Sequence, residues 1–395
     1  MKRGMLWLWK AYLKDTSAKK TGTKGVTRFT PFCLFLHIPD IKSYNTVIVR
    51  LELYYRKAKN MKIKEFGEFG LISLLAQQIP APSGNVVMGI GDDTAVLRHE
   101  PGKLLLMTTD MLVEEVHFSL RYCPFRSVGW KALAVNVSDI SAMGGTPSAA
   151  TVSIGIPPYV DVEQMEQLYQ GLGECAGEYG VDVVGGDTVK SPDRLVVNIT
   201  LLGTVADDRV IYRSGAKPGD FIMVTGSLGN SAAGLYALSA DISENSAENA
   251  REAVHAHLYP QARVKEGGLL GASGHVTAMN DISDGLASEV LEICRASGTG
   301  CELEAAKIPQ TASVVELGRR VGVSPRGWAL YGGEDFELVF TVTPRELDSV
   351  ITILEQAGCF PAVIGRITPP EGGCVLIEQK GKSILTPGGY NHFRE

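Results

Sequence analysis

The sequence lacks any apolar run approaching the about 20 residues that a membrane-spanning helix needs. The longest such stretch near the start, residues 32–38, is far too short. The seven cysteines form no Cys-x-x-Cys pair, and no apolar segment of the signal-peptide type follows the first Lys-Arg pair. We therefore expect free thiols in a reducing compartment, and a cytoplasmic protein with no membrane partner.

Several catalytic motifs are absent as well. The sequence has no G-x-x-x-x-G-K-[ST] loop, so it is not a P-loop enzyme. The H-R-D and D-F-G pair of protein kinases is missing, and so are H-E-x-x-H and any sequence cluster of cysteines that would indicate zinc. Residues 226–234, GSLGNSAAG, lack the G-x-G-x-x-G spacing, and we interpret these glycines as packing residues.

Positive charge is scarce outside the first 60 residues. Residues 1–60 carry 13 Lys and Arg against 3 Asp and Glu, a net charge of +10, which leaves −16 for the other 335 residues. A strongly acidic body excludes a nucleic-acid partner, because phosphate backbones need a basic surface. An acidic protein can still bind phosphates when metal ions lie between its carboxylates and the ligand.

The chain length of 395 residues and a hydrophobic content of 45% fit a globular protein of two domains. Residues 1–60 differ in composition from the rest, and Met61 opens MKIKEFGEFGLISLL, which resembles a natural start. We expect residues 1–60 to be a dispensable extension, with a targeting segment or a surface-binding arm as the alternatives. The turn-rich RSGAKPGD, residues 213–220, indicates a boundary between domains at 61–206 and 207–395.

The body alternates between strand-like and helix-like segments. The pattern predicts strands at 95–98, 103–109, 149–156, 195–205, 221–225, 276–279 and 337–342, followed by short closing strands. It predicts helices at 68–78, 127–143, 162–179, from about 230, 261–272, 283–297 and 345–357. The first half is typical of an α+β unit, and the second half alternates as α/β layers do.

Acidic residues recur where strands or helices are expected to end, beside Gly, Ser and Thr instead of Lys or Arg. These signatures are Asp92-Asp93 in GDDTAV, Asp110 in TTDML, Asp139 in NVSDIS, Asp187 in VVGGDTV, and Asp281 with Asp284 in NDISDGL. Each one alone is compatible with a turn, a helix cap or a polar helix face. Together they favour a cleft for Mg²⁺, which takes oxygen ligands and commonly bridges carboxylates to nucleotide phosphates.

Eight ordered motifs resemble one family, the thiamine-monophosphate kinases. They are GIGDDTAV, TTDMLVEEVHF, KALAVNVSDISAMG, VVGGDTV, RSGAKPGD, DISDGLASEV, GGEDFEL and GYNHF. The resemblance runs from about Lys64 to Phe393 and leaves out residues 1–60. It implies a two-domain fold like that of aminoimidazole ribonucleotide synthetase. The first, mixed-sheet domain would pair with a second copy into a dimeric barrel, the second domain would be α/β, and ATP would lie beside the acids.

The resemblance also implies roles for individual residues. It implies that several Mg²⁺ ions are held by Asp93, Thr108, Thr109, Asp110, Asp139, Asp187, Asp281 and Asp284. It implies contacts to ATP from Tyr169, Gly186, Asp187, Arg213 and Ser283. It implies contacts to thiamine monophosphate from His117, Glu334 and Tyr390. Asp92 ranks below Asp93 and is expected to orient a ligand.

From the residues alone, His117 is also compatible with a packed histidine, Glu334 with a turn and Tyr390 with a core aromatic. The chemistry agrees with the family role. A phosphate monoester has a second pKa near 6, so the acceptor is mostly a dianion at pH 7 and needs no catalytic base. We therefore expect no catalytic side chain that moves a proton. Phosphoryl transfer instead requires charge neutralisation and in-line positioning.

The hypothesis is an ATP-dependent kinase that converts thiamine monophosphate into thiamine diphosphate, acting as a homodimer. One alternative is another enzyme of the same superfamily, of the aminoimidazole ribonucleotide or selenophosphate synthetase type. The second type usually has a reactive Cys near its start, and none lies in MKIKEFGEF. The other alternative is a nucleotide sensor without catalysis.

Overall fold

The computed structural model describes residues 74–81, 86–88, 96–97, 101–240 and 248–389, all of which lie in one compact unit formed by residues 58–395. Asp92, Asp93 and Tyr390 lie outside the described residues, and so does most of the helix predicted at 68–78. In the part of the chain that is described, no helix has both the length and the hydropathy to cross a membrane.

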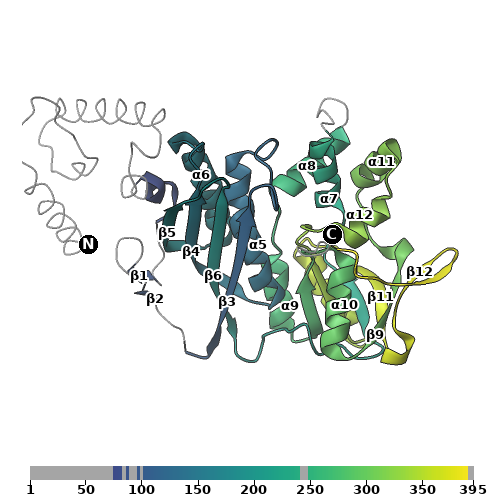
Figure 1. Cartoon of the computed structure of the whole chain (residues 1–395). Helices are drawn as coiled ribbons and strands as arrows, with labels where there is room; N and C mark the ends of the chain where they lie inside the picture. Colours follow the sequence, from purple (N-terminus) through teal and green to yellow (C-terminus); the bar gives the residue numbers. More distant parts are fainter. Residues whose placement is uncertain (1–73, 82–85, 89–95, 98–100, 241–247, 390–395) are drawn as a thin grey trace, which may run out of the picture. The chain divides into compact units, whose positions relative to one another are not determined.

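A four-stranded sheet of order β3-β6-β4-β5 forms the first half of the unit (Figure 1). Its strands are β3 (Lys103–Val113), β4 (Thr146–Ile156), β5 (Asp182–Lys190) and β6 (Val196–Ala206). β6 runs antiparallel to both neighbours, and β4 and β5 are parallel. Short elements precede this sheet: η2 (Ala76–Gln78), β1 (Val86–Met88) and β2 (Val96–Leu97).

Two long helices, α5 (Phe125–Ala142) and α6 (Val162–Tyr179), cover one face of this sheet. The helix α6 begins where predicted because Asp161 and Gln164 form a capping box, and it ends at Gly180 with a left-handed φ of 66°. The helices α5 and α6 approach closely at Gly129 and Gly171. A Cβ on Gly171 would lie 1.8 Å from the Arg126 carbonyl oxygen. Glycine is therefore required at this crossing.

The opposite face of the first sheet carries apolar side chains that no described residue covers. On β3, Leu105, Met107 and Met111 are exposed, Met107 by 73%, whereas Leu112 on the helix-covered face is only 5% exposed. Residues two apart on a strand share a face, so β3 has one packed and one bare side.

The second half contains a seven-stranded sheet of order β13-β12-β9-β11-β7-β10-β8. Its strands are β7 (Phe221–Val224), β8 (Val276–Asp281), β9 (Gly300–Glu304), β10 (Leu338–Val342), β11 (Ala362–Thr368), β12 (Cys374–Glu378) and β13 (Gly381–Ile384). Among the described strand pairs of this second sheet, only β9 and β12 are parallel. The predicted alternation of strands and helices is present in this half, and the sheet that results is mixed. Chain neighbours such as β7 and β8 both pair with β10 and not with each other.

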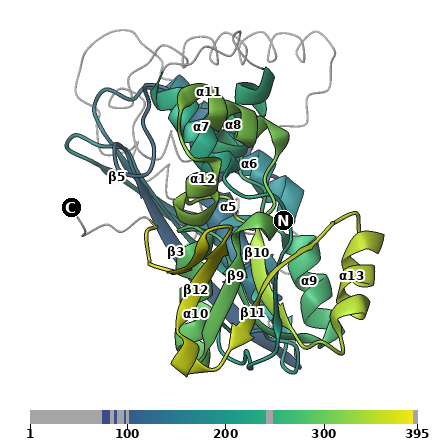
Figure 2. The ribbon, with the colours of Figure 1, turned by 90° about the vertical axis from the view of Figure 1, so that its right-hand side faces the viewer.

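Helices cover both faces of the second sheet. The helices of the second half are α7 (Asn230–Ser239), α8 (Glu248–Leu258), α9 (Val264–Ser273), α10 (Leu286–Ser297), α11 (Ala312–Val321), α12 (Pro325–Tyr331) and α13 (Leu347–Gln356), with short turns η4 (Ala305–Lys307) and η5 (Pro370–Gly372). Of these, α10 covers one face of the sheet, and α9 and α13 cover the other. Val224 and Val339 lie in the apolar core between the sheet and α10. Their strand neighbours Met223 and Phe340 lie in the core between the sheet and the pair α9 and α13. Figure 2 shows α9 and α13 side by side at this sheet. A third cluster joins α7, α8, α11 and α12.

Candidate active site

Three acidic residues from separate elements form what we call the acid cluster: Asp110 on β3, Asp139 on α5 and Asp281 at the end of β8. Thr108 Oγ1 donates a hydrogen bond of 2.5 Å to Asp139 Oδ2, and Ser138 Oγ donates one of 2.7 Å to Asp281 Oδ2. Asp281 is only 2% exposed. The helix α5 thus links the first sheet to the second through two consecutive residues, Ser138 and Asp139.

Burial and mutual repulsion hold protons on the acid cluster. Burial, followed by the charge of Asp139, raises the pKa of Asp110 from 3.8 to about 7. The same two causes raise the pKa of Asp281 to about 7. Burial also raises the pKa of Asp139, against hydrogen bonds that lower it. Among the described residues, no lysine or arginine is in direct ion-pair contact with these three carboxylates. They therefore suit a hard cation that takes oxygen ligands and replaces the protons.

Two predicted metal ligands lie on the other face of the first sheet. The strand register aligns Asp187 with Ser153, Ser153 with Asn198 and Asn198 with Met111, so these side chains share the bare face. Thr109 lies on that face too, where its hydroxyl donates to the Ile199 carbonyl at 3.0 Å. Asp187 is three strand intervals from β3, about 14 Å at the usual strand spacing. A single chain therefore does not bring Asp187 into the acid cluster.

Asp284 and Ser283 lie in the loop between β8 and α10, next to the acid cluster in sequence. The Asp284 amide donates to Glu289 Oε1 at 3.0 Å, and the Ser283 hydroxyl faces the same oxygen at 3.4 Å. Burial and the charge of Asp281 raise the pKa of Glu289 to about 8. The helix predicted at 283–297 begins later than expected, at Leu286, and its N-cap is Gly285, so neither Asp281 nor Ser283 caps it.

The expected positions of two acids within their elements are corrected as well. Asp110 lies inside β3, which extends beyond its predicted end at residue 109, and Asp187 lies inside β5, where the pattern predicts no strand. Gly186 is required there, since a Cβ would lie 1.9 Å from the Val152 carbonyl oxygen on the neighbouring strand.

Of the other residues expected to contact ATP, Arg213 lies near the acid cluster and Tyr169 lies in a core. Arg213 Nε donates to Asn280 Oδ1 at 2.9 Å, and its Nη1 lies 2.8 Å from Glu292 Oε2. The charge of Arg213 acts to lower the pKa values of Asp139 and Asp281. Tyr169 is buried among the residues that join α6 to the sheet, and burial raises its pKa to about 12.

The predicted substrate residue Glu334 belongs to a buried polar network with two residues that the sequence reasoning missed. Lys131 Nζ on α5 lies 2.8 Å from Glu334 Oε2, and His257 Nδ1 on α8 lies 3.3 Å from the same oxygen. Burial acts to raise the pKa of Glu334, but the charges of Lys131, His257 and His117 outweigh it, so that this pKa is lowered. Burial lowers the pKa of His257 to about 4.

His117 is therefore electrostatically linked to Glu334, as expected for two residues that face one ligand. Its Nδ1 accepts a hydrogen bond of 3.0 Å from the Val113 amide at the end of β3. Glu334 has a left-handed φ of 66°, which is uncommon for a residue with a side chain and is found most often at functional sites. A lysine within the apolar run WKALAV was the one sequence signal that could have revealed Lys131.

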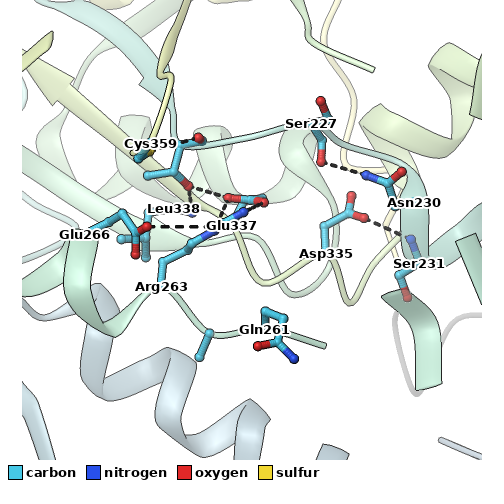
Figure 3. Close-up of polar contacts among 12 residues, drawn as sticks. Ser227, Asn230, Ser231, Gln261, Arg263, Glu266, Asp335, Glu337, Leu338 and Cys359 are labelled. Atoms are coloured by element: carbon cyan, nitrogen blue, oxygen red, sulfur yellow. Dashed lines mark hydrogen bonds and ion pairs between the residues drawn. The ribbon is translucent and has the colours of Figure 1, made fainter. Parts of the chain in front are cut away.

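A cavity of about 250 Å³ lies beside the loop that carries Glu334, between α7, α8 and the segment 259–263. Figure 3 shows how the loop is tied down: Asp335 accepts from the Ser231 amide at 3.1 Å, and Glu337 pairs with Arg263, whose Nε lies 2.7 Å away. Asp335 thereby caps the start of α7, where Gly229 has a left-handed φ. These contacts hold the segment that follows Glu334, and the Glu334 amide itself donates to the Ser283 carbonyl at 2.7 Å.

The arrangement of a four-stranded sheet next to a mixed seven-stranded sheet has known counterparts. The chain matches the family models described as AIR synthase related protein, N-terminal domain, over residues 91–205, and AIR synthase related protein, C-terminal domain, over residues 217–377. The fold is therefore that of the AIR synthase related proteins.

Individual relatives narrow the assignment. A thiamine-monophosphate kinase of Bacillus subtilis (strain 168) is 37% identical over 329 residues, which cover 83% of this chain and 99% of the relative. The solved structure of AaThiL complexed with AMPPCP and TMP is 34% identical, with a TM-score of 0.66, and covers 85% of this chain and 99% of its own. A thiamine-monophosphate kinase structure from Stenotrophomonas maltophilia K279a is 30% identical, with a TM-score of 0.70, and covers 78% and 96%. The chain belongs to the thiamine-monophosphate kinase family.

Proposed function

We propose that this protein transfers the γ-phosphoryl group of ATP to thiamine monophosphate, forming thiamine diphosphate and ADP. The proposal is carried by the acid cluster, which combines one carboxylate from each of β3, α5 and β8 in a chain whose relatives bear the kinase name. It is supported by AaThiL, whose structure contains AMPPCP, an ATP analogue, together with TMP.

In this proposal Asp110, Asp139 and Asp281 hold magnesium, and Asp93, Thr108 and Asp284 complete its surroundings. The donor set fits the ion, because buried carboxylates that repel one another and retain protons at neutral pH gain most when a cation neutralises them. Magnesium, when bound, would neutralise the charge that two phosphate groups bring together. Thr109 and Asp187 are proposed to approach the nucleotide from the bare face of the first sheet, and Gly186 is proposed to contact it through its backbone.

The remaining residues position the two substrates. Arg213, with Ser283 and Tyr169 as further contacts, is proposed to bind ATP. Lys131 keeps Glu334 ionised, so that its carboxylate can accept a hydrogen bond from the amine of the acceptor's pyrimidine. His117 and Tyr390 are proposed to contact the same molecule. No residue is assigned as a base, since the acceptor phosphate is already mostly ionised at pH 7.

We further propose that residues 61–206 and 207–395 are the two domains, and that the bare face of the first sheet pairs with a second copy. Leu105, Met107 and Met111 form an apolar row on that face, beside the polar Asn198. Pairing would also place Asp187 opposite the second copy. Met107→Lys should shift the protein from dimer to monomer in sedimentation equilibrium; a wild-type monomer would refute this part.

The function is tested by incubating the full chain with MgCl₂, ATP and thiamine monophosphate and separating the thiamine phosphates by chromatography. Thiamine diphosphate should form in the presence of MgCl₂ and not in EDTA. Thiamine itself serves as the control acceptor, and Asp139→Asn as the control variant. Folded wild-type protein that consumes no ATP with thiamine monophosphate would refute the proposal.

A further inference from the structure

Three cysteines at separate places in the sequence meet in the second half of the unit, and none of them is among the residues assigned to phosphoryl transfer. Cys294 lies on α10, Cys301 on β9 and Cys374 on β12, and their Sγ atoms all lie within 4.8 Å of one another. We call them the thiol cluster. Cys301 and Cys374 are register partners on parallel strands, and Cys294 faces them from the helix that covers this side of the sheet.

The backbone around the thiol cluster is held in place. The Cys301 amide donates to the Gly373 carbonyl at 3.1 Å, and the Leu385 amide donates to the Cys374 carbonyl at 2.9 Å. A Cβ on Gly300 would lie 2.3 Å from the same Gly373 carbonyl oxygen, so the strands approach as closely as glycine permits. The three sulfur atoms are therefore presented by fixed elements and not by a loop that can move aside.

Access and charge distinguish this cluster from the other described cysteines. Cys294 and Cys301 are buried, whereas Cys374 is partly exposed and offers an entry route. Hydrogen bonds from the Cys294 and Cys301 thiols lower the pKa of Cys374 well below its usual range, so the cluster stabilises one thiolate. By contrast, Cys359 is a single buried thiol that donates to the Thr225 carbonyl at 3.2 Å.

We propose that Cys294, Cys301 and Cys374 form a binding site for a soft d¹⁰ metal cation, Cu(I), held by three sulfur ligands. Thiolates select soft ions. Among the described residues, no carboxylate or imidazole belongs to the group, so the fourth ligand of a structural zinc site is missing. With metal–sulfur bonds of about 2.3 Å, a trigonal site has sulfur atoms about 4.0 Å apart, a spacing that the cluster reaches by small side-chain movements. On binding, the thiols release their protons to solvent, and no electron is transferred.

Metal binding here has a structural consequence. The last turn of α10 also holds the loop of Arg213, because Ser297 Oγ accepts from the Gly215 and Ala216 amides at 3.2 and 3.1 Å. Fixing Cys294 to β9 and β12 would hold that helix against the sheet. Cu(I) should therefore raise the thermal midpoint of the full chain, since a ligand that binds only the folded state stabilises it.

The experiment uses the full chain with Cys33→Ser in every variant, which removes the one cysteine outside the described residues. Fully reduced protein is titrated with Cu(I) without oxygen, in competition with a coloured Cu(I) chelator. One Cu(I) per chain should be withdrawn from the chelator, and Cys374→Ser should weaken binding at least tenfold. Cys359→Ser, which keeps the hydrogen bond to Thr225, should bind as the parent does, and X-ray absorption should give three sulfur neighbours.

Three results would overturn the proposal. The first is binding that survives in Cys374→Ser, and the second is binding that is equally weakened in Cys359→Ser. The third is reduced protein that leaves all Cu(I) with the chelator but forms a Cys301–Cys374 disulfide in air, detected by mass spectrometry. That last result would identify the cluster as a redox pair. Circular dichroism of each variant shows whether its fold is retained. The X-ray absorption spectrum of the parent protein tests the three sulfur ligands even if a variant fails to fold.

Discussion

The metal-free protein should lose stability as the pH rises from about 4 to 8, and Mg²⁺ should restore it. A carboxyl group whose pKa is higher in the folded protein than in the unfolded chain binds its proton more tightly when folded. Its contribution is present in full below the unfolded pKa of 3.8 and is lost as the pH rises through about 7, the pKa that Asp110 and Asp281 reach in the fold.

The size of the loss follows from those two values. A pKa that rises from 3.8 to about 7 corresponds to about 4 kcal/mol, since a tenfold change in proton affinity is worth about 1.4 kcal/mol. Asp110, Asp139 and Asp281 titrate as a coupled set, so we expect one such loss for the cluster and not one for each residue. The charge of Asp139 contributes less to the raised pKa values of Asp110 and Asp281 than burial does. The substitution Asp139→Asn should therefore recover about 1–2 kcal/mol of unfolding free energy at pH 8 and none at pH 4.

Thermal unfolding in EDTA and in MgCl₂, at pH 5 and pH 8, measures the effect. For domains of this size, 1 kcal/mol moves the midpoint by about 2–4 °C. Mg²⁺ should raise the midpoint more at pH 8 than at pH 5, because at pH 5 it must displace protons. In EDTA at pH 8, Asp139→Asn should melt a few degrees above the wild type. In MgCl₂, Asp139→Asn should show little of the increase in thermal midpoint that Mg²⁺ produces in the wild type.

Glu289 and Asp335 also have raised pKa values, so the decline in EDTA alone does not identify the acid cluster. The control is Asp187→Asn, which removes a carboxylate from the bare face of the sheet and should leave the EDTA profile unchanged. The reasoning is refuted if Mg²⁺ stabilises equally at both pH values, or if Asp139→Asn is less stable than the wild type in EDTA at pH 8.

Four further results are expected. Asp139→Asn should lower kcat for thiamine diphosphate formation at least 100-fold; near-normal turnover would contradict the metal-binding role. Lys131→Met should lower the free energy of unfolding in urea at pH 7 by about 3 kcal/mol. This is the lower end of the loss expected for a broken buried ion pair, because the Glu334 side chain is 27% exposed. The double variant Lys131→Met/Glu334→Gln should recover most of that loss, and no recovery would show that packing dominates. Arg213→Ala should raise the KM for ATP more than tenfold and leave the KM for thiamine monophosphate nearly unchanged, and equal increases would argue against its assignment. Deleting residues 1–60 should keep kcat within about twofold, and a larger loss would show that the extension is functional.

The elements with strong local signals were predictable from the sequence. The helix α6 matches its predicted bounds because its capping box and terminal glycine are encoded within a few residues of its ends. The helix α5 ends before Gly144-Gly145, as predicted. β5 was missed because paired glycines signal a turn, whereas this edge strand needs Gly186 for close contact with β4. The strand order of the second sheet was not predictable, because long-range pairing and not chain order determines it.

The same distinction between local signals and long-range contacts holds for the residues of the candidate site. Residue types and short motifs were enough to propose Asp110, Asp139 and Asp281 as neighbours, and the structure brings these three together. Lys131 and His257 were missed because each meets Glu334 through the fold, across 203 residues in the case of Lys131. The thiol cluster was missed for the same reason, since its cysteines have no regular spacing and meet only when β12 pairs with β9.

The helix α5 contacts both the acid cluster and Glu334, the two parts of the proposed active site. Lys131 holds Glu334, and Ser138 and Asp139 hold the acid cluster, all from α5. Residues seven apart lie on the same face of a helix, and the rise of 1.5 Å per residue separates Lys131 from Ser138 by about 11 Å. In the proposed function, an acceptor with its phosphate among the acids and an amine at Glu334 would lie along this stretch of the helix. Because α5 is buried against both sheets, that distance is fixed by backbone hydrogen bonds, and an acceptor that is too short would engage only one end. Thiamine monophosphate, the proposed acceptor, carries a phosphate and an amine at opposite ends, which fits this arrangement.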